Sequence, residues 1–264
     1  MEDRLTAEAI TRHLHTTRLG RKLLIEPSVD STNTQVKQRF GNEDEGFVLL
    51  AEEQTAGRGR LGRQFVSPAG SGLYMSIVLH PDLPLERISL LMLISAVSIC
   101  ETLEHQCGIW PKIKWVNDVF IRGYKCAGIL TESSFSTGGN KPDFSVVGIG
   151  VNLKFDREAY PELADIAGGI WDETHHLPTR AQLAASILNA FEPWYDKLLA
   201  GESKELLQAY RSRMNCLRKR IMVSSPQGQY PATCVDLTDE GNLVIVDQNG
   251  TQTILRAGEI SVRL

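Results

Sequence analysis

Apolar positions along the chain fall into two kinds of run, one of strand length and one with helical spacing. Strand-length runs occupy residues 23–25, 47–51, 72–79, 112–115, 119–121, 125–132 and 144–153. Helical spacing covers residues 5–15, 32–40, 84–107, 180–200 and 203–214. Asp30 and Ser31 are suitable caps for the second of these helices. The helix of residues 84–107 is apolar on several faces, so we expect it to be largely buried.

The pattern changes after Cys216, where runs of about six β-forming residues follow one another closely. Turn signals separate these runs at 227–228, 240–241 and 249–250, and the last is Asn-Gly, the strongest short hairpin signal. About five short strands in so short a segment are typical of a small barrel. We therefore predict two domains, an α+β body over residues 1–216 and a small β-barrel over residues 217–264.

Composition and charge narrow the class of protein. The 264 residues are 42% hydrophobic and 23% charged with a formal net charge of −4, so nothing favours a nucleic-acid binder. The most apolar stretch, residues 88–100, contains serines and is predicted to be too short to span a bilayer, and no signal-peptide pattern begins the sequence. Five cysteines without a Cys-x-x-Cys pair indicate reduced thiols. We expect a cytoplasmic protein that does not enter a membrane.

The segment 57–63, Gly-Arg-Gly-Arg-Leu-Gly-Arg, is the most informative part of the sequence. Its glycines allow the backbone to approach a ligand closely, and its arginines place forked cationic donors around that ligand. Such a loop suits a phosphate or a carboxylate, although it matches neither of the two common nucleotide-binding loops. The alternatives are a flexible surface loop and an Arg-Gly segment that contacts RNA. An RNA contact needs stacking aromatics, and only Phe65 and Tyr74 are close.

Three further segments place polar groups at or near strand ends. Lys114–Asp118 brings a cation, an aromatic ring, an amide and a carboxylate to the end of one strand. Lys125–Leu130 follows a turn with a second lysine and small residues, and Gly148–Asn152 is a strand with two glycines and a terminal amide. Strand ends of this kind are typical ligand sites, although an isolated Lys125 would be interpreted as a solvated strand-edge lysine.

Together these segments resemble the biotin–protein ligase family over most of the first 155 residues. The family's motifs stand in order as Asp-Ser-Thr-Asn at 30–33, Gln-Thr-Ala-Gly-Arg-Gly-Arg at 54–60, Lys-Trp-x-Asn-Asp at 114–118, Lys-x-Ala-Gly-Ile-Leu at 125–130 and Gly-Ile-Gly-Val-Asn at 148–152. Each motif is weak alone, but together and in order they are specific. The resemblance implies an α+β fold whose mixed central sheet carries helices mainly on one face, followed by a C-terminal barrel of the SH3-like type.

The resemblance also implies an activity. Biotin would be activated with ATP and Mg²⁺ to biotinyl-5'-AMP, with release of pyrophosphate. The biotin would then be transferred to a lysine on the biotin carboxyl carrier protein domain of acetyl-CoA carboxylase or a related carboxylase. The nearest enzymatic alternative is a lipoate or octanoate transferase, and the arginine-bearing glycine loop favours the biotin branch.

Particular residues inherit roles from the resemblance. The implied catalytic residues are Lys125, Arg58 and Asp118. The implied biotin-binding residues are Ser31, Thr32, Asn33, Gln54, Arg58, Gly59, Arg60 and Lys125. The implied residues for ATP and the adenylate are Arg58, Arg60, Arg63, Phe65, Lys114, Asn117, Asp118, Lys125 and Asn152. Asp118 would serve either the acceptor lysine or the metal, and both roles stay open here.

The sequence departs from the family at two places and leaves three other questions. Val116 stands where the family often has Pro, and Phe65 is the nearby aromatic where the family commonly has Trp. Only about 28 residues precede the motif at 30–33, whereas a winged DNA-binding domain needs roughly twice that, so we expect no DNA binding. His175-His176 is interpreted as a solvated pair, so no fixed metal site is expected. Both monomer and homodimer remain open.

Overall fold

A seven-stranded sheet forms the centre of the protein in a computed structural model that describes residues 5–137, 139–172, 178–225, 228–256 and 261–263. The strand order is β1-β2-β3-β7-β6-β5-β4. The strands are β1 Leu23–Glu26, β2 Val48–Ala51, β3 Gly72–Leu79, β4 Lys112–Lys114, β5 Asp118–Ile121, β6 Tyr124–Ser134 and β7 Phe144–Asn152. β1 and β2 run parallel and the other neighbours antiparallel, so the sheet is mixed, as the sequence predicted.

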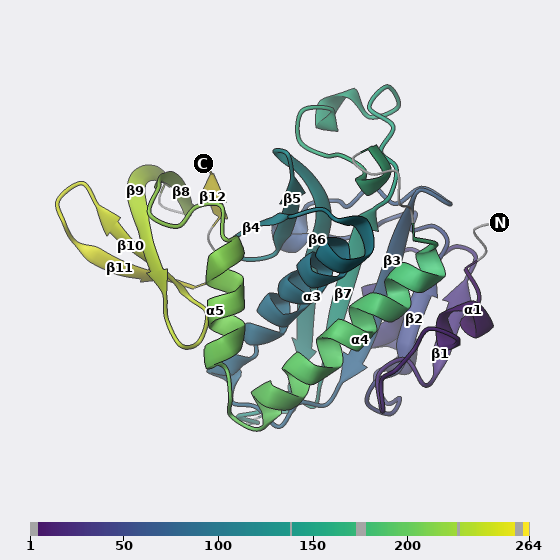
Figure 1. Cartoon of the computed structure of the whole chain (residues 1–264). Helices are drawn as coiled ribbons and strands as arrows, with labels where there is room; N and C mark the ends of the chain where they lie inside the picture. The colour runs from purple at the N-terminus through teal and green to yellow at the C-terminus, as the bar shows by residue number, and fades with distance from the viewer. Residues whose placement is uncertain (1–4, 138, 173–177, 226–227, 257–260, 264) are drawn as a thin grey trace.

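Two long helices cover one face of this sheet (Figure 1). They are α3, Leu90–Cys107, and α4, Arg180–Leu199, which pack on one another over the main apolar core. The opposite face carries α2, Thr32–Gln35, which continues as a π-helix over Val36–Phe40 above a much smaller apolar cluster. The helices therefore lie mainly on one face, and part of the other face is left for a site.

Helix α3 and the short helical turn before it, Leu85–Arg87, form one continuous helical segment. The helical segment Leu85–Cys107 has 23 residues and contains an 18-residue window with a mean hydropathy of 1.4, so by length and composition alone it could cross a membrane. The apolar stretch of residues 88–100 is the central part of this longer segment. Within the described residues it is the one such helix, and 78% of its apolar window is buried inside the protein. This burial is typical of the core helix of a folded domain, as its apolar faces predicted.

Side-chain hydrogen bonds fix where two of the other helices begin and end. Thr179 and Gln182 form a reciprocal capping box at the start of α4. α1 spans Ala7–Thr11, shorter than the predicted 5–15, because Asn189 of α4 accepts from the N–H of His15 and donates to the carbonyl of His13. This long-range contact takes backbone groups that a longer helix would have used.

The residues after Cys216 form a separate five-stranded antiparallel sheet, β11-β10-β9-β8-β12. Its strands are β8 Arg220–Ser225, β9 Gly228–Leu237, β10 Leu243–Asp247, β11 Gln252–Leu255 and β12 Ser261–Arg263. The predicted turns at 240–241 and 249–250 are confirmed, whereas the turn at 227–228 lies partly outside the described residues.

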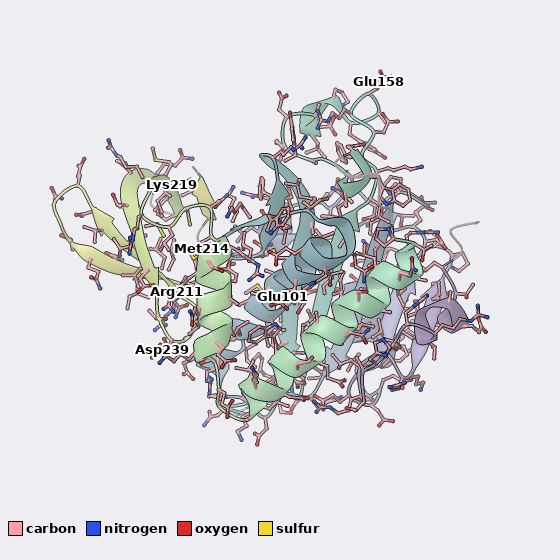
Figure 2. All side chains as sticks on the ribbon, viewed as in Figure 1. Glu101, Glu158, Arg211, Met214, Lys219 and Asp239 are labelled. Carbon is pink, nitrogen blue, oxygen red and sulfur yellow. The ribbon has the colours of Figure 1, made fainter. Side chains whose placement is uncertain are left out.

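This sheet docks on the body through α5, Lys204–Arg213, and through the β9–β10 turn. Arg211 of α5 points toward the C-terminal sheet (Figure 2) and donates to the carboxylate of Asp236 and the carbonyl of Leu237, each at 2.7 Å. In the turn, the carbonyl of Gly241 accepts from the indole N–H of Trp115 at 3.0 Å. Trp115 stands at the end of β4, so the C-terminal sheet supports that end of the central sheet.

Candidate active site

The site lies on the sheet face opposite α3 and α4. Strands β3, β7 and β6 present Ser76, Gly148, Gly150 and Gly128 to this face, while the alternate strand residues enter the main core. A cavity of about 120 Å³ opens there. The predicted residues that line it are Ser31, Thr32, Asn33, Gln54, Arg58, Gly59, Arg60, Arg63, Phe65, Lys114, Asn117, Asp118 and Lys125. Asn152 is absent from this lining; it is buried on the same strand, two residues beyond Gly150.

One end of the cavity is neutral and polar. The side-chain oxygen of Gln54 accepts from the backbone N–H of Thr32 at 2.9 Å and from its hydroxyl at 3.2 Å, and the Gln54 amide donates to Ser67 at 2.9 Å. The Ser76 hydroxyl lies 2.7 Å from both the Thr32 hydroxyl and the Asn33 side-chain oxygen. The contacts among Thr32, Asn33, Gln54, Ser67 and Ser76 join neutral groups and orient their donors and acceptors, which suits a neutral polar ring.

The start of α2 differs in detail from the predicted cap. Ser31 is the N-cap residue, but its side chain makes no capping hydrogen bond. The Asp30 carboxylate instead accepts from the backbone N–H of Ser31 at 2.6 Å and from the Gln35 amide at 2.9 Å. The Ser31 hydroxyl is therefore not committed to the helix, although the residue is buried in the cavity wall.

The other end of the cavity is charged. Lys125 and Asp118 form an ion pair with 2.6 Å between Nζ and Oδ1, and both side chains are mostly buried. Arg60 donates to the Asn117 side-chain oxygen at 3.1 Å, and the Asn117 amide donates to the carbonyl of Ile129 at 2.9 Å. Burial lowers the pKa of Arg60 from its ordinary value, and the Asp118 charge opposes that shift. Two of the three predicted catalytic groups, Lys125 and Asp118, are thus partners of each other.

Three glycines of the sheet create the space for these side chains. A Cβ atom at Gly148 would lie 2.2 Å from the Asn33 side-chain oxygen, and one at Gly150 would lie 2.6 Å from the Phe65 ring. At Gly128 the nearest atoms would belong to Lys125, at 3.1 Å. The sequence predicted close approach at Gly148 and Gly150, and the groups that approach them are the protein's own side chains.

The glycine-arginine segment folds as a tight hairpin beside the cavity. Its backbone is closed by hydrogen bonds from Gly59 N–H to the Arg63 carbonyl at 2.7 Å and from Phe65 N–H to the Gly57 carbonyl at 2.9 Å. At the tip Leu61 has φ of 56° and Gly62 has φ of 72°, so the turn uses the left-handed region that glycine adopts most easily. The side chain of Leu61 is exposed.

Several residues of the site were missed from the sequence. Ser76 and Ser67 complete the polar network, and Glu132 of β6 binds Arg58 and Asn33. Strand periodicity could have placed Glu132 on the cavity face, since it lies two and four positions from Leu130 and Gly128 of the motif at 125–130. Ser76 gave no such signal, because β3 carries none of the predicted site residues. The peptide bond between Trp115 and Val116, where the family often has Pro, is cis.

No group of three or more His, Cys, Asp or Glu side chains that could hold a metal ion occurs in the part of the chain that the structure describes. His175 and His176, which the sequence interpreted as a solvated pair, lie outside that part. The five cysteines are free and buried.

The comparisons with known proteins show a ligase that joins a small acid to a protein. The family model described as "Biotin/lipoate A/B protein ligase family" matches residues 25–152. The "Bifunctional ligase/repressor BirA" of Bacillus spizizenii is 30% identical over 96% of this chain and 78% of its own length. The "Biotin--[acetyl-CoA-carboxylase] ligase" of Mycobacterium tuberculosis is 30% identical over 91% of this chain and 88% of its own.

A solved structure agrees. The biotin protein ligase from Aquifex aeolicus in complex with biotin and ATP superposes with a TM-score of 0.79 at 30% identity, covering 92% of this chain and 99% of its own. The chain therefore belongs to the biotin/lipoate A/B protein ligase family, in its biotin protein ligase branch.

Proposed function

We propose that this protein activates biotin with ATP to biotinyl-5'-AMP and transfers the biotin to a lysine of a biotin carboxyl carrier domain. The observation that supports this most is the division of the cavity into a neutral polar end, at Thr32, Asn33 and Gln54, and a charged end, at Lys125 and Asp118. Biotin has the same division, with a neutral ureido ring at one end and a carboxylate at the other.

In the first half-reaction a biotin carboxylate oxygen attacks the α-phosphorus of ATP. A new oxygen–phosphorus bond forms, the bond to the β-phosphate oxygen breaks, and pyrophosphate leaves. Two anions must approach each other, so the charge of Lys125, with that of Arg58 and Arg60, offsets their repulsion. Lys125 must exchange Asp118 for the reacting anions, and the Asp118 carboxylate is then free to act elsewhere.

In the second half-reaction the neutral amine of the acceptor lysine attacks the biotinyl carbonyl. An amide bond forms, the bond from the carbonyl carbon to the phosphate oxygen breaks, and AMP leaves. The amine loses a proton, and Asp118 is the carboxylate in the cavity lining that can orient the amine or accept that proton. The hairpin of residues 57–63 would exclude water from the mixed anhydride between the two steps.

Magnesium would enter with the ATP phosphates, because Mg²⁺ is usually bound by one or two carboxylates together with substrate phosphates. Asp118 fits that requirement as a carboxylate in the charged end of the cavity, and Asn117 adds an amide oxygen beside it. The ion would supply further charge neutralisation at the phosphates.

The remaining features of the proposal concern the adenine, the partner and the C-terminal sheet. We place the adenine against Phe65, with Arg63, Lys114 and Asn152 near the nucleotide, because Phe65 packs on the glycine floor of the cavity.

The acceptor would be the carrier domain of acetyl-CoA carboxylase or a related carboxylase, in the cytoplasm. Residues 217–264 would form a separate SH3-like domain. Specific DNA binding by this chain is not expected, because its net charge is −4.

Incubation of the protein with biotin, ATP, Mg²⁺ and a carrier domain tests this function. One biotin on one carrier lysine is expected. Equal use of lipoate in place of biotin would favour the alternative branch of the family.

A further inference from the structure

Glu132 occupies a position in the site that none of the proposed steps uses. It lies on β6 two residues beyond the cavity-lining Leu130, with a side chain only 18% exposed. Its Oε2 accepts from the Asn33 side-chain amide at 3.0 Å, and its Oε1 lies 3.2 Å from Arg58 Nη1 and 2.5 Å from Lys37 Nζ. One carboxylate thus joins the polar end of the cavity to the glycine-arginine hairpin.

The contact with Asn33 determines which group that side chain offers to a ligand. The Asn33 amide nitrogen donates to Glu132 and to the carbonyl of Leu130 at 3.1 Å, while its oxygen lies against Ser76. Because both donors of the amide are used, a flip would place the amide oxygen against two acceptors and is disfavoured. Glu132 therefore fixes the Asn33 oxygen toward Ser76 and Gly148.

The contact with Arg58 is of a different kind. The Arg58 side chain is 47% exposed, and an ion pair this open is easily exchanged because solvent screens it. A phosphate or carboxylate inside the cavity can bind a guanidinium through two parallel hydrogen bonds, which is the stronger arrangement. The Glu132 carboxylate is thus a resting partner that Arg58 can leave when an anionic ligand arrives.

Glu132 is ionised at neutral pH and serves two cations. Burial alone would raise its pKa, but hydrogen bonds from Lys37 and Asn33 and the charges of Lys37 and Arg58 bring that pKa below 4.5. Removing the negative charge would leave Lys37 and Arg58 close together without their shared anion.

We propose that Glu132 is a positioning residue for the biotin-activating step: it fixes the Asn33 amide for the biotin head and holds Arg58 beside the cavity until an anion displaces it. This inference rests on the proposed function for its ligand, whereas its two contacts join side chains of the protein itself. The Asn33 part and the Arg58 part can be separated by substitution, because glutamine retains a hydrogen-bond acceptor and lacks the charge.

The test compares Glu132→Ala with Glu132→Gln. Loss of the hydrogen bond to Asn33 in Glu132→Ala should raise both the biotin KM and the biotin Kd about tenfold while kcat stays within about threefold. Glu132→Gln should restore the biotin KM to near the wild-type value. In both variants trypsin should cut after Arg58 several times faster in the ligand-free protein, because the charge that holds Arg58 is gone.

Lys37→Met is the matched control, because it removes another partner of the same carboxylate and leaves Asn33 and Arg58 in place. Neither the biotin Kd nor cleavage after Arg58 should rise in it. The inference is overturned if Glu132→Ala changes kcat alone, if Glu132→Gln loses as much biotin affinity as Glu132→Ala, or if cleavage after Arg58 is unchanged. If Glu132→Ala does not fold, the rate of cleavage after Arg58 in Glu132→Gln tests the inference: faster cleavage than in the wild type supports it, and an unchanged rate overturns it. Wild-type protein that releases no pyrophosphate would refute the proposed function, while cleavage would still test Glu132.

Discussion

At the scale of single residues, the charged end of the cavity depends on a pair rather than on two independent groups. Lys125 and Asp118 are 2.6 Å apart and mostly buried, so each is the nearest counter-charge of the other. Removing one partner of a buried pair leaves the other charge without compensation. Substitutions at either position should therefore disturb both half-reactions to some degree, and the ratio of the two effects is the informative quantity.

Lys125→Ala should slow adenylate formation more than transfer. One well-placed charge-stabilising group contributes on the order of 3 kcal/mol to the transition state, roughly a hundredfold in rate. Single-turnover pyrophosphate release should fall by at least that factor, while transfer from pre-made biotinyl-adenylate persists.

Asp118→Asn should show the opposite pattern, in which transfer to the acceptor lysine slows more than adenylate formation. Lys154→Ala removes a lysine that lies over Trp171 outside the cavity lining and is the control. If Asp118→Asn abolishes adenylate formation, its role is at the metal.

Gly150→Ala should weaken ATP binding selectively. Its Cβ would lie 2.6 Å from the Phe65 ring, closer than any real contact, so the ring would have to leave the floor of the cavity. Overpacking of this kind costs about 1–3 kcal/mol, so we expect the KM for ATP to rise about tenfold or more with a smaller change in the biotin KM. Pyrophosphate release measured at varied ATP checks this. An unchanged KM for ATP would separate Phe65 from the nucleotide. Gly139→Ala, in the loop between β6 and β7, is the comparison.

The sequence predicted the site residues that belong to the motifs, but not the residues that hydrogen-bond to them. Thr32, Gln54 and Lys125 were found because they stand in ordered motifs. Ser76 and Glu132 stand outside those motifs, and which site residues they contact depends on the register in which β3, β6 and β7 pair. Such cross-strand neighbours depend on sheet order, which a single sequence does not specify.

At the scale of elements, the hairpin of residues 57–63 is the part of the site that is best placed to close. It is held by its own backbone hydrogen bonds and by side-chain contacts from Arg58 to Glu132 and from Arg60 to Asn117. Both contacts are charge-assisted pairs that an anionic ligand can replace. The hairpin can therefore move as a unit between the sheet and a bound adenylate.

Ligand should protect this hairpin from trypsin. We expect cleavage after Arg58, Arg60 or Arg63 in the free protein and at least several-fold slower cleavage with biotin and ATP together, because the adenylate would bind the arginines. Cleavage at a distant site, such as Arg87 before α3, serves as the internal control, since its rate should not change. The gating role is contradicted if the three arginines are cut equally fast in both states.

Elements were predicted well where apolar periodicity is strong and less well where a distant contact ends them. The boundaries of β3 match the prediction residue for residue, and β7 and α4 match to within one residue. α1 is shorter than predicted because Asn189, far along the chain, takes the backbone groups of His13 and His15. The π-helical continuation of α2 gives no signal in the apolar spacing.

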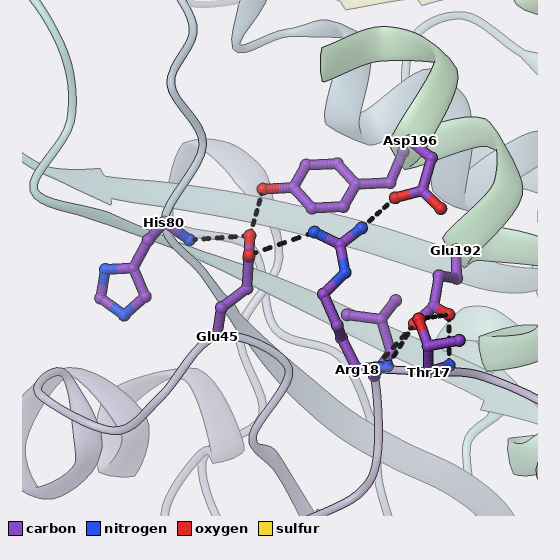
Figure 3. Close-up of polar contacts among 8 residues, drawn as sticks. Thr17, Arg18, Glu45, His80, Glu192 and Asp196 are labelled. Carbon is purple, nitrogen blue, oxygen red and sulfur yellow. Dashed lines mark hydrogen bonds and ion pairs between the residues drawn. The ribbon is translucent and has the colours of Figure 1, made fainter. Parts of the chain in front are cut away.

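At the scale of the whole molecule, a polar network ties the N-terminal segment to α4 (Figure 3). Glu192 accepts from the backbone N–H groups of Thr17, Arg18 and Leu19, the last two at 3.0 and 2.8 Å. Arg18 binds Asp196 and also Glu45, which precedes β2 and accepts from the Tyr195 hydroxyl at 2.5 Å. One helix thus fixes the chain on both sides of β1, the edge strand of the sheet.

This network predicts loss of stability in acid. Burial opposes ionisation of Glu192, but its backbone hydrogen bonds lower its pKa below 4.5. The contribution to stability is fully present above the unfolded pKa of about 4.5 and is lost as the pH falls through the lower folded pKa. Glu192→Gln should lower the free energy of unfolding by about 1–3 kcal/mol at pH 7 and flatten its decrease between about pH 5 and pH 3. Urea unfolding at several pH values checks both. An unaltered acid slope would mean that other carboxylates dominate it.

The central claim concerns the activity of the whole protein, and one measurement tests it directly. Protein, biotin, ATP, Mg²⁺ and a biotin carboxyl carrier domain are incubated together, and the intact mass of the carrier domain is followed over time. The account predicts one added biotinyl group on one carrier lysine, dependent on ATP, with lipoate giving no comparable product. A carrier domain that stays unmodified with biotin, or that is modified equally by lipoate, would contradict it.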